Sequence, residues 1–193
     1  MRQVVLRGAR VRLRPWVDAD LAPFAALNAD PEVMRYMTAP LARDESDAFA
    51  GRIRTQHEAQ GFGLWALDVP DRAGTMAFAG FVGISATLPF SLPLAGIVPE
   101  PHEIGWRLAR HAWGKGFATE AAMLALRHAF EVLALPQIVS FTALANTASQ
   151  AVMRRIGLAR RGEFDHPRMA EGHPMRHHVL YALDAPTTGT APR

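Results

Sequence analysis

The stretch Glu103-Ile-Gly-Trp-Arg-Leu-Ala-Arg-His-Ala-Trp-Gly-Lys-Gly-Phe-Ala-Thr-Glu120 decides the fold. Its first six residues, with His102 before them, predict a strand that ends near Leu108. A short loop follows, with a glycine on either side of Lys115. Apolar side chains then recur at helical spacing, so a long helix is expected over residues 117–133.

The loop around Lys115 has the features of an anion site. Glycines let the backbone approach an anion closely, and the free N–H groups at a helix start point at it. The helix dipole adds about half a positive charge there. Lys115 is the only lysine of the chain. The same loop is also compatible with an ordinary tight turn between a strand and a helix.

Two sharper phosphate motifs are excluded. A Walker loop needs Gly at position 109 and Ser or Thr at position 116, where this chain has Ala109 and Gly116. A dinucleotide fingerprint needs a third glycine where Thr119 stands.

The stretch resembles motif A of the GNAT superfamily of acetyl-CoA dependent N-acetyltransferases. It is most similar to the branch that includes the ribosomal-protein N-terminal acetyltransferases. The resemblance covers roughly residues 8–184 and keeps the order of its motifs. Those motifs are Asp30–Tyr36, Glu103–Leu108, Trp113–Ala121, Asn146 with Ser149, Gly157-Leu158 and Val179–Leu183.

The resemblance implies an α+β GNAT fold, in which a central twisted mixed sheet, flanked by helices, splays open to admit acetyl-CoA. Loop amides from His111 to Thr119 would hold the pyrophosphate. The strand ending at Leu108 would pair with the pantetheine and polarise the thioester carbonyl. The residues so implied are Trp106, Arg107, Leu108, His111, Trp113, Gly114, Lys115, Gly116, Phe117, Ala118, Thr119, Asn146 and Ser149. His111 departs from the Gln or Arg of the family, so weaker or pH-dependent binding is expected at most.

Amide formation from a thioester needs a neutral amine, stabilisation of a developing oxyanion and a proton for the leaving thiolate. The chain has no cysteine, which excludes a cysteinyl intermediate and favours direct attack in a ternary complex. Glu103 is the first candidate base, with an exposed strand carboxylate or an ion-pair partner as the alternative. The resemblance makes Ser149 the candidate acid and Asn146 a ligand-orienting residue, with helix capping as the alternative for each.

The acceptor amine is left open between a protein N-terminus and a small molecule. Candidates for its pocket, with core packing as the alternative, are Trp16, Tyr36, Met37, Phe62 and Trp65. A non-catalytic acetyl-CoA-binding or regulatory module of the same fold is the alternative function.

No metal is expected. His173 and His177 are four residues apart, with His166 and His178 near them, but Pro167 and Pro174 argue against a helix there and no cysteine assists.

With 193 residues, 49% of them hydrophobic, the chain has the size and composition of one globular domain. A single domain is expected over residues 1–184, with a flexible tail over 185–193. The net charge is only +3. Two arginine clusters, over residues 2–14 and 154–161, are interpreted as a solvated strand edge and a helix end, or else as an anion site for a phosphate-rich ligand.

No nucleic-acid partner is expected. Residues 73–99 carry no charge, but prolines interrupt them, so a buried strand and a proline-rich loop are expected rather than a membrane span. We therefore expect a cytoplasmic protein, and a homodimer is compatible with the sequence.

Outside the deciding stretch, alternating and β-rich runs predict further strands, and capping patterns predict further helices. Asp18, Asp30 and a capping box over residues 147–150 are the expected helix starts. The expected strands are 10–15, 62–69, 78–88, 138–144, 161–164 and 179–183, and a helix is expected over 44–60.

Overall fold

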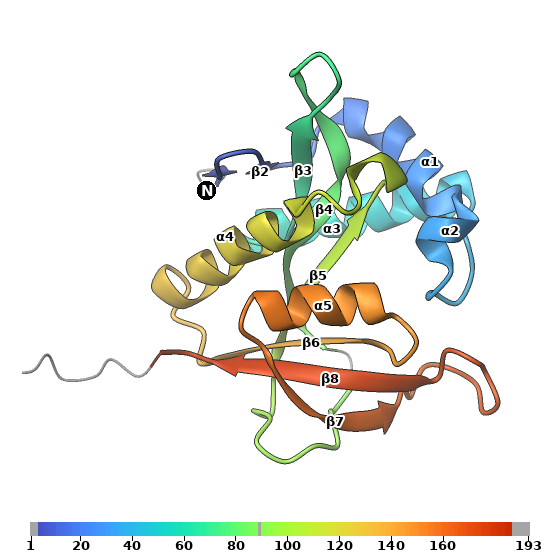
Figure 1. The fold of residues 1–193 in the computed structure, drawn as a ribbon, viewed down its shortest axis with the longest axis vertical. Coiled ribbons are helices and arrows are strands. Elements are labelled where there is room, and N and C mark those ends of the chain that lie inside the picture. The colour runs from blue at the N-terminus through green and yellow to red at the C-terminus, as the bar shows by residue number, and fades with distance from the viewer. Residues whose placement is uncertain (1–3, 89, 187–193) are drawn as a thin grey trace, which may run out of the picture.

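The computed structural model describes residues 4–88 and 90–186 of the chain. The strands of this part form one sheet of eight, in the order β1-β2-β3-β4-β5-β6-β8-β7 (Figure 1). Their bounds are β1 Leu6–Arg7, β2 Arg12–Arg14, β3 Leu64–Pro70, β4 Met76–Thr87, β5 His102–Leu108, β6 Gln137–Ala143, β7 Ala159–Asp165 and β8 His177–Asp184. All neighbours are antiparallel except β5 and β6, so the expected mixed sheet is confirmed.

Helices cover both faces of the sheet (Figure 1). They are α1 Leu21–Ala29, α2 Pro31–Met34, α3 Arg43–Gln60, α4 Phe117–Glu131 and α5 Thr147–Arg155, with 3-10 turns at Asp18–Asp20 and Arg110–Ala112. Successive side chains of a strand point to opposite faces. In β3, Leu64 and Ala66 therefore join the core formed with α1 and α3, whereas Trp65 and Leu67 join the core formed with α4 and α5.

The sheet opens between β5 and β6. These two strands pair only at His102 with Ile138 and at Glu103 with Val139. Beyond these pairs the strands diverge (Figure 1). The remainder of β5, from Ile104 to Leu108, therefore lies along an open gap in the middle of the sheet. This is the splay that the family resemblance implied.

Local patterns predicted most elements, and β5 has its expected bounds. Strand β1 was not expected, several strand bounds shift by one or two residues, and the helix termini differ as follows. The helix expected over residues 117–133 ends at Glu131. Asp18 begins a 3-10 turn, and α1 starts only at Leu21. The start of α5 is not a capping box at residues 147–150: Asn146 is the N-cap, and its Oδ1 accepts a hydrogen bond from the Ser149 amide at 3.2 Å.

The uncharged segment over residues 73–99 forms β4 and the loop that follows it. In this loop, Phe90, Leu92 and Leu94 pack against the cluster of Val139, Phe164, Leu180 and Ala182 on β6, β7 and β8. Among the described residues, no helix is both long and apolar enough to cross a bilayer. Residues 187–193 of the expected tail lie outside the described part.

Three of the N-terminal arginines, Arg10, Arg12 and Arg14, are ion-paired with carboxylates. Arg12 and Arg14 both donate to Asp68, at 2.6–2.9 Å, and Arg14 also binds Asp20. These contacts raise the pKa of Arg14, with the hydrogen bond to Asp20 as the largest cause.

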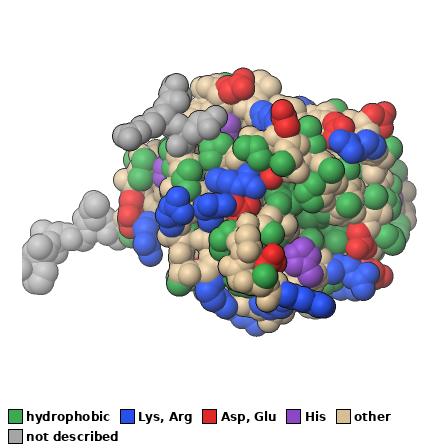
Figure 2. Space-filling model, turned by 90° about the horizontal axis from the view of Figure 1, so that it is seen from above, with side chains coloured by type: hydrophobic (Ala, Val, Ile, Leu, Met, Phe, Trp, Pro, Cys, Tyr) green, Lys and Arg blue, Asp and Glu red, His purple; other side chains and the backbone are tan. Residues whose placement is uncertain are grey.

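The second cluster is also engaged with neighbours. Arg160 pairs with Glu163, and Arg161 pairs with Asp184. On the face seen in Figure 2, basic and acidic side chains are interspersed. Ion pairs to neighbouring carboxylates thus engage Arg10, Arg12, Arg14, Arg160 and Arg161 of the two clusters.

Candidate active site

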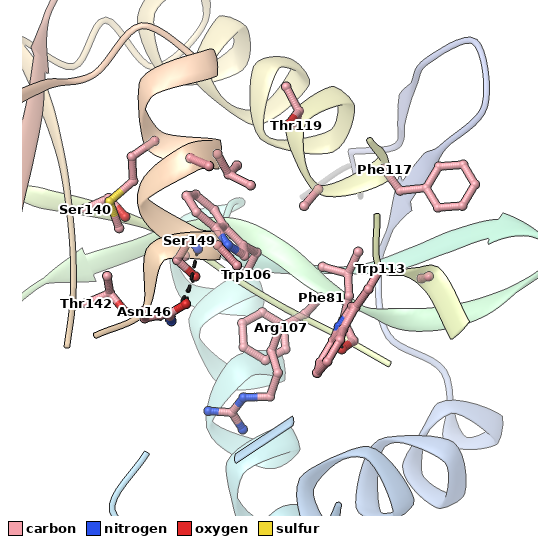
Figure 3. A pocket seen from close by; sticks show the side chains of 18 of the residues that line it. Phe81, Trp106, Arg107, Trp113, Phe117, Thr119, Ser140, Thr142, Asn146 and Ser149 are labelled. Atoms are coloured by element: carbon pink, nitrogen blue, oxygen red, sulfur yellow. Dashed lines mark hydrogen bonds between the residues drawn. The ribbon is translucent and has the colours of Figure 1, made fainter. Parts of the chain in front are cut away.

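A cavity of about 1090 Å³ occupies the gap between β5 and β6 (Figure 3). Its walls come from β5, the loop before α4, the first turn of α4, the end of β6 and α5, with α2 and α3 on the other face. Most of the expected site residues line it: Glu103, Trp106, Arg107, Leu108, Trp113, Gly114, Gly116, Phe117, Ala118, Thr119, Asn146 and Ser149. The expected residues His111 and Lys115 are exposed and do not line it.

The loop before α4 depends on two glycines. Gly114 and Gly116 have φ of 70° and 81°, in the left-handed region that other residues adopt only with strain. Gly116 is the N-cap of α4, and the first intrahelical bond runs from the Glu120 amide to its carbonyl. The amides of residues 117–119 therefore have no intrahelical partner, and all three residues line the cavity. Such amides suit a phosphate group.

We expect Gly116→Ala to weaken acetyl-CoA binding roughly tenfold, because left-handed backbone costs a residue with a Cβ about 1–2 kcal/mol. Gly172→Ala is the matched control: Gly172 has φ of 79°, is exposed and lies outside the cavity lining. Calorimetric titration with acetyl-CoA measures both variants. Equal loss of affinity in the two, or none in Gly116→Ala, would contradict the role of the loop.

The N-terminal segment holds this loop in place. Arg10 Nη1 donates to the Lys115 carbonyl at 3.0 Å, and Nε donates to Glu120 Oε2 at 2.9 Å. The Arg10 amide donates to Glu120 Oε1 at 2.7 Å, and the guanidinium lies 5.3 Å from the centroid of the Phe117 ring. Glu120 thus ties α4 to the N-terminal segment. Sequence reasoning missed Arg10, and only the basic run before Pro15 pointed toward it.

Trp113 fastens the loop to the end of β5. Its indole Nε1 donates to the Leu108 carbonyl at 2.7 Å. The ring is nevertheless 42% exposed and forms part of the cavity wall. A ligand in the cavity would cover it.

Asn146 caps α5 and also orients Ser149 (Figure 3). Its amide nitrogen donates to Thr142 Oγ1 at 2.9 Å and to Ser149 Oγ at 3.1 Å. Because Ser149 Oγ accepts this bond, its own proton remains available to a group in the cavity. Capping and ligand orientation are therefore compatible in one residue.

The two faces of β5 carry different chemistry. Ile104 and Leu108 belong to the core beneath α4 and α5, and Trp106 packs against it. The alternate residues Glu103, Gly105 and Arg107 face the side of α1–α3. The Arg107 side chain therefore lies away from the glycine loop, and only its backbone remains a candidate for the cofactor contact that we expected.

Glu103 lines the cavity without a hydrogen bond or ion pair to any other described side chain. Burial raises the pKa of its carboxyl to about 8. A general base works best when its pKa lies near the working pH. The ion-pair alternative for Glu103 is thus not what the structure shows.

The candidate acceptor residues divide into two groups. Tyr36 and Met37 line the cavity. Trp16 and Trp65 are core residues, 8% and 0% exposed, and Phe62 packs against the core. Further lining residues, which tertiary packing brings to the cavity, include Glu32, Val33, Phe49, Phe81 and Ser85.

The histidines near the C-terminus pack or pair with neighbours. His166 and His178 have ring centroids 4.9 Å apart and lie among Phe141 and Phe164. His177 pairs with Glu163 and Asp165. In the part of the chain that the structure describes, no group of three or more His, Asp or Glu side chains is arranged so that it could hold a metal ion.

The splayed sheet, the glycine loop at the start of α4 and the cavity between them define the class of coenzyme A-dependent acyltransferases. Residues 10–159 match the family model described as "Acetyltransferase (GNAT) domain". The chain therefore belongs to the GNAT acetyltransferase family, as its motifs predicted.

Three known proteins illustrate the likeness. The FsC-acetyl coenzyme A-N(2)-transacetylase of Aspergillus fumigatus is 30% identical over 161 residues, which are 81% of this chain and 65% of that protein. RimL, a ribosomal L7/L12 alpha-N-protein acetyltransferase solved with coenzyme A, has a TM-score of 0.74 at 15% identity, covering 94% of this chain and 98% of its own. Mycobacterium smegmatis RimJ, solved with CoA-disulfide, has a TM-score of 0.71 at 23% identity, covering 94% and 86%. RimL and RimJ share the fold of this chain.

Proposed function

We propose that the chain transfers the acetyl group of acetyl-CoA to a primary amine by direct attack in a ternary complex. The observation that carries this proposal is Glu103, a carboxyl without a partner among the described side chains, whose pKa of about 8 suits proton removal from an amine. It lies in the cavity that the glycine loop and the open edge of β5 also line. The fold of the CoA-bound structures supports the same cofactor.

Each backbone or side-chain group of the site has one task in this scheme. The amides at the start of α4 hold the pyrophosphate, and the backbone of β5 along the gap stabilises negative charge on the thioester oxygen. Glu103 takes a proton from the amine as the C–N bond forms. Ser149 gives a proton to the sulfur as the C–S bond breaks, and Asn146 keeps its hydroxyl aimed.

We expect Ser149→Ala to lower kcat by about 10²-fold, within the range for loss of a positioned proton donor. The α5 cap should survive, because Asn146 Oδ1 accepts from the backbone amide of residue 149 and its Nδ2 still reaches Thr142. Thr147→Ala, on the exposed side of the same helical turn, serves as the control. Steady-state rates and thermal unfolding are measured for both. Unchanged kcat in Ser149→Ala would remove this residue from the mechanism.

Calorimetric titration of the whole chain with acetyl-CoA, desulfo-CoA and ATP tests the function directly. We expect acetyl-CoA and desulfo-CoA to bind and ATP to bind far more weakly, followed by acetylation of amines or peptide N-termini. Binding without transfer to any amine would favour a non-catalytic acetyl-CoA-binding module. Absence of acetyl-CoA binding by folded protein would overturn the proposal.

A further inference from the structure

Arg107 projects a guanidinium into the half of the cavity opposite the glycine loop (Figure 3). It lies 5.5 Å from the centroid of Phe81 and 5.9 Å from that of Phe49. Both rings belong to the core of α1–α3 or pack against it. This half of the cavity is therefore separate from the region that holds the pyrophosphate.

The charge of Arg107 is not balanced by any described side chain. Its hydrogen bond from Nη1 goes to Asn28 Oδ1 at 2.6 Å, and Asn28 is a neutral amide that itself donates to Ser46. No carboxylate of the described residues lies within ion-pair distance of it, in contrast to Arg12 and Arg14. Burial accordingly lowers the pKa of Arg107 to about 10.

A guanidinium that is removed from water without a counter-charge lowers the stability of the folded protein. An anionic ligand would supply the missing charge, so a cavity that contains such a guanidinium is suited to an anion. The guanidinium offers a planar fork of donors that fits a carboxylate in a bidentate manner. Only Nη1 is engaged within the described part, which leaves Nε and Nη2 for such a ligand.

Space exists between Arg107 and Glu103. The two residues are four apart on one face of β5, so their Cα atoms are separated by about 13 Å. Gly105 lies between them, and a Cβ built there meets nothing within 4 Å. A ligand can thus lie along the strand with its amine toward the carboxylate of Glu103 and an anion toward Arg107.

We propose that Arg107 binds a carboxylate of the acceptor, which makes the substrate an amine that also carries a carboxylate. This inference rests on the proposed function and narrows it. The carboxylate can belong to a small amino acid or to an acidic side chain close to a peptide N-terminus, since both present the same pair of charges.

The test compares matched acceptors with the whole chain. One set contains ω-amino acids of increasing length and their N-methylamides. The other contains short peptides with Glu or Gln at the second or third position. For the best-fitting member of one set, we expect the acid to have a kcat/KM at least tenfold above that of its amide, and the set that shows this identifies the source of the carboxylate.

Arg107→Gln should abolish this preference by raising the KM for the acid at least tenfold more than it raises the KM for the matched amide. Arg107→Lys keeps the charge without the fork and should retain part of the preference, which also provides a second variant if Arg107→Gln does not fold. Arg52→Gln is the control, because Arg52 also lies over Phe49, at 5.5 Å, but does not line the cavity.

The outcomes separate the two proposals. If amines are acetylated without preference for the acid, or if both Arg107 variants keep the full preference, the inference about the carboxylate is overturned and the acetyltransferase function stands. If no amine is acetylated and acetyl-CoA does not bind, the proposed function itself fails.

Discussion

Replacing Glu103 by Gln is expected to lower kcat by 10²- to 10⁴-fold at pH 8, which is the range for loss of a general base. The variant keeps the size of the side chain and removes only its ability to take a proton. Acetyl-CoA affinity should stay within twofold, because the amides proposed to hold the pyrophosphate belong to α4 on the other face of the sheet. Steady-state rates with calorimetric titration separate the two effects.

The direction in which the rate changes with pH follows from the burial of the Glu103 carboxyl. With a pKa of about 8, the Glu103 carboxylate is mostly protonated at pH 6, and its ionised fraction rises about tenfold between pH 6 and pH 7 before levelling above pH 8. The amine acceptor also changes its protonation with pH, but this change is the same in assays of the wild type and of Glu103→Gln. The ratio of wild-type to Glu103→Gln rates should therefore rise through pH 8, where about half of the carboxyl is ionised, and become constant only about one pH unit higher. The other charged groups at the cavity wall are Arg10, Glu32, Arg35, Arg107, Glu120 and Arg155.

Stability gives a readout of Glu103 that is independent of catalysis. Its folded-state pKa is above the unfolded value of 4.5, so the native state binds the proton more tightly and ionisation penalises folding increasingly from pH 4.5 to pH 8. Glu103→Gln removes that penalty. It should unfold at a higher temperature than wild type at pH 9, with a smaller difference at pH 5.

Glu131→Gln, at the exposed end of α4, is the control for both experiments. A flat rate ratio across pH would contradict a base at position 103. A thermal midpoint of Glu103→Gln at or below that of wild type at pH 9 would contradict the raised pKa.

The part of the site that could be predicted from the sequence is the part formed by residues that are close together in the chain. β5, the loop and α4 follow one another within 30 residues, and each has its own signal: β-rich residues, glycines and helical periodicity. The cap of α5 was placed one residue late, because Asn146 and Thr147 are both acceptable N-caps and only the hydrogen bonds distinguish them.

The acceptor half of the cavity could not be predicted in this way. Its walls come from α2, α3, β4 and β5, which meet only after the sheet has formed. The alternation along β5 does place Glu103 and Arg107 on one face, since they are four residues apart. What the alternation does not reveal is that no carboxylate on α1–α3 reaches Arg107, because this depends on side chains far away in the chain.

Asp68→Asn is expected to lower the free energy of unfolding by about 3–5 kcal/mol, the usual cost of removing one partner of a buried charge network. Asp68 is 1% exposed and receives two hydrogen bonds from each of Arg12 and Arg14. The neutral asparagine amide cannot balance the charges of Arg12 and Arg14, and its NH₂ group would face the N–H donors of these two guanidinium groups. Urea unfolding at pH 7 measures the loss.

Asp44→Asn is the control, because Asp44 is exposed and the change there should stay within about 0.5 kcal/mol. Arg12→Gln should cost less than Asp68→Asn, since the Arg12 side chain is 33% exposed. A loss below about 1 kcal/mol in Asp68→Asn would show that the network does not stabilise the fold.

The ion pairs of Asp68 also influence the position of the glycine loop before α4. Arg12 and Arg14 fix β2 to β3 through Asp68, and Arg10 lies only two residues before Arg12, with its side chain on the Lys115 carbonyl and on Glu120. Loosening β2 should therefore loosen the loop that Arg10 holds. Folded Asp68→Asn, titrated with acetyl-CoA well below its unfolding midpoint, should bind several-fold more weakly than wild type. Unchanged affinity would mean that Arg10 holds the loop without help from the ion pairs behind it.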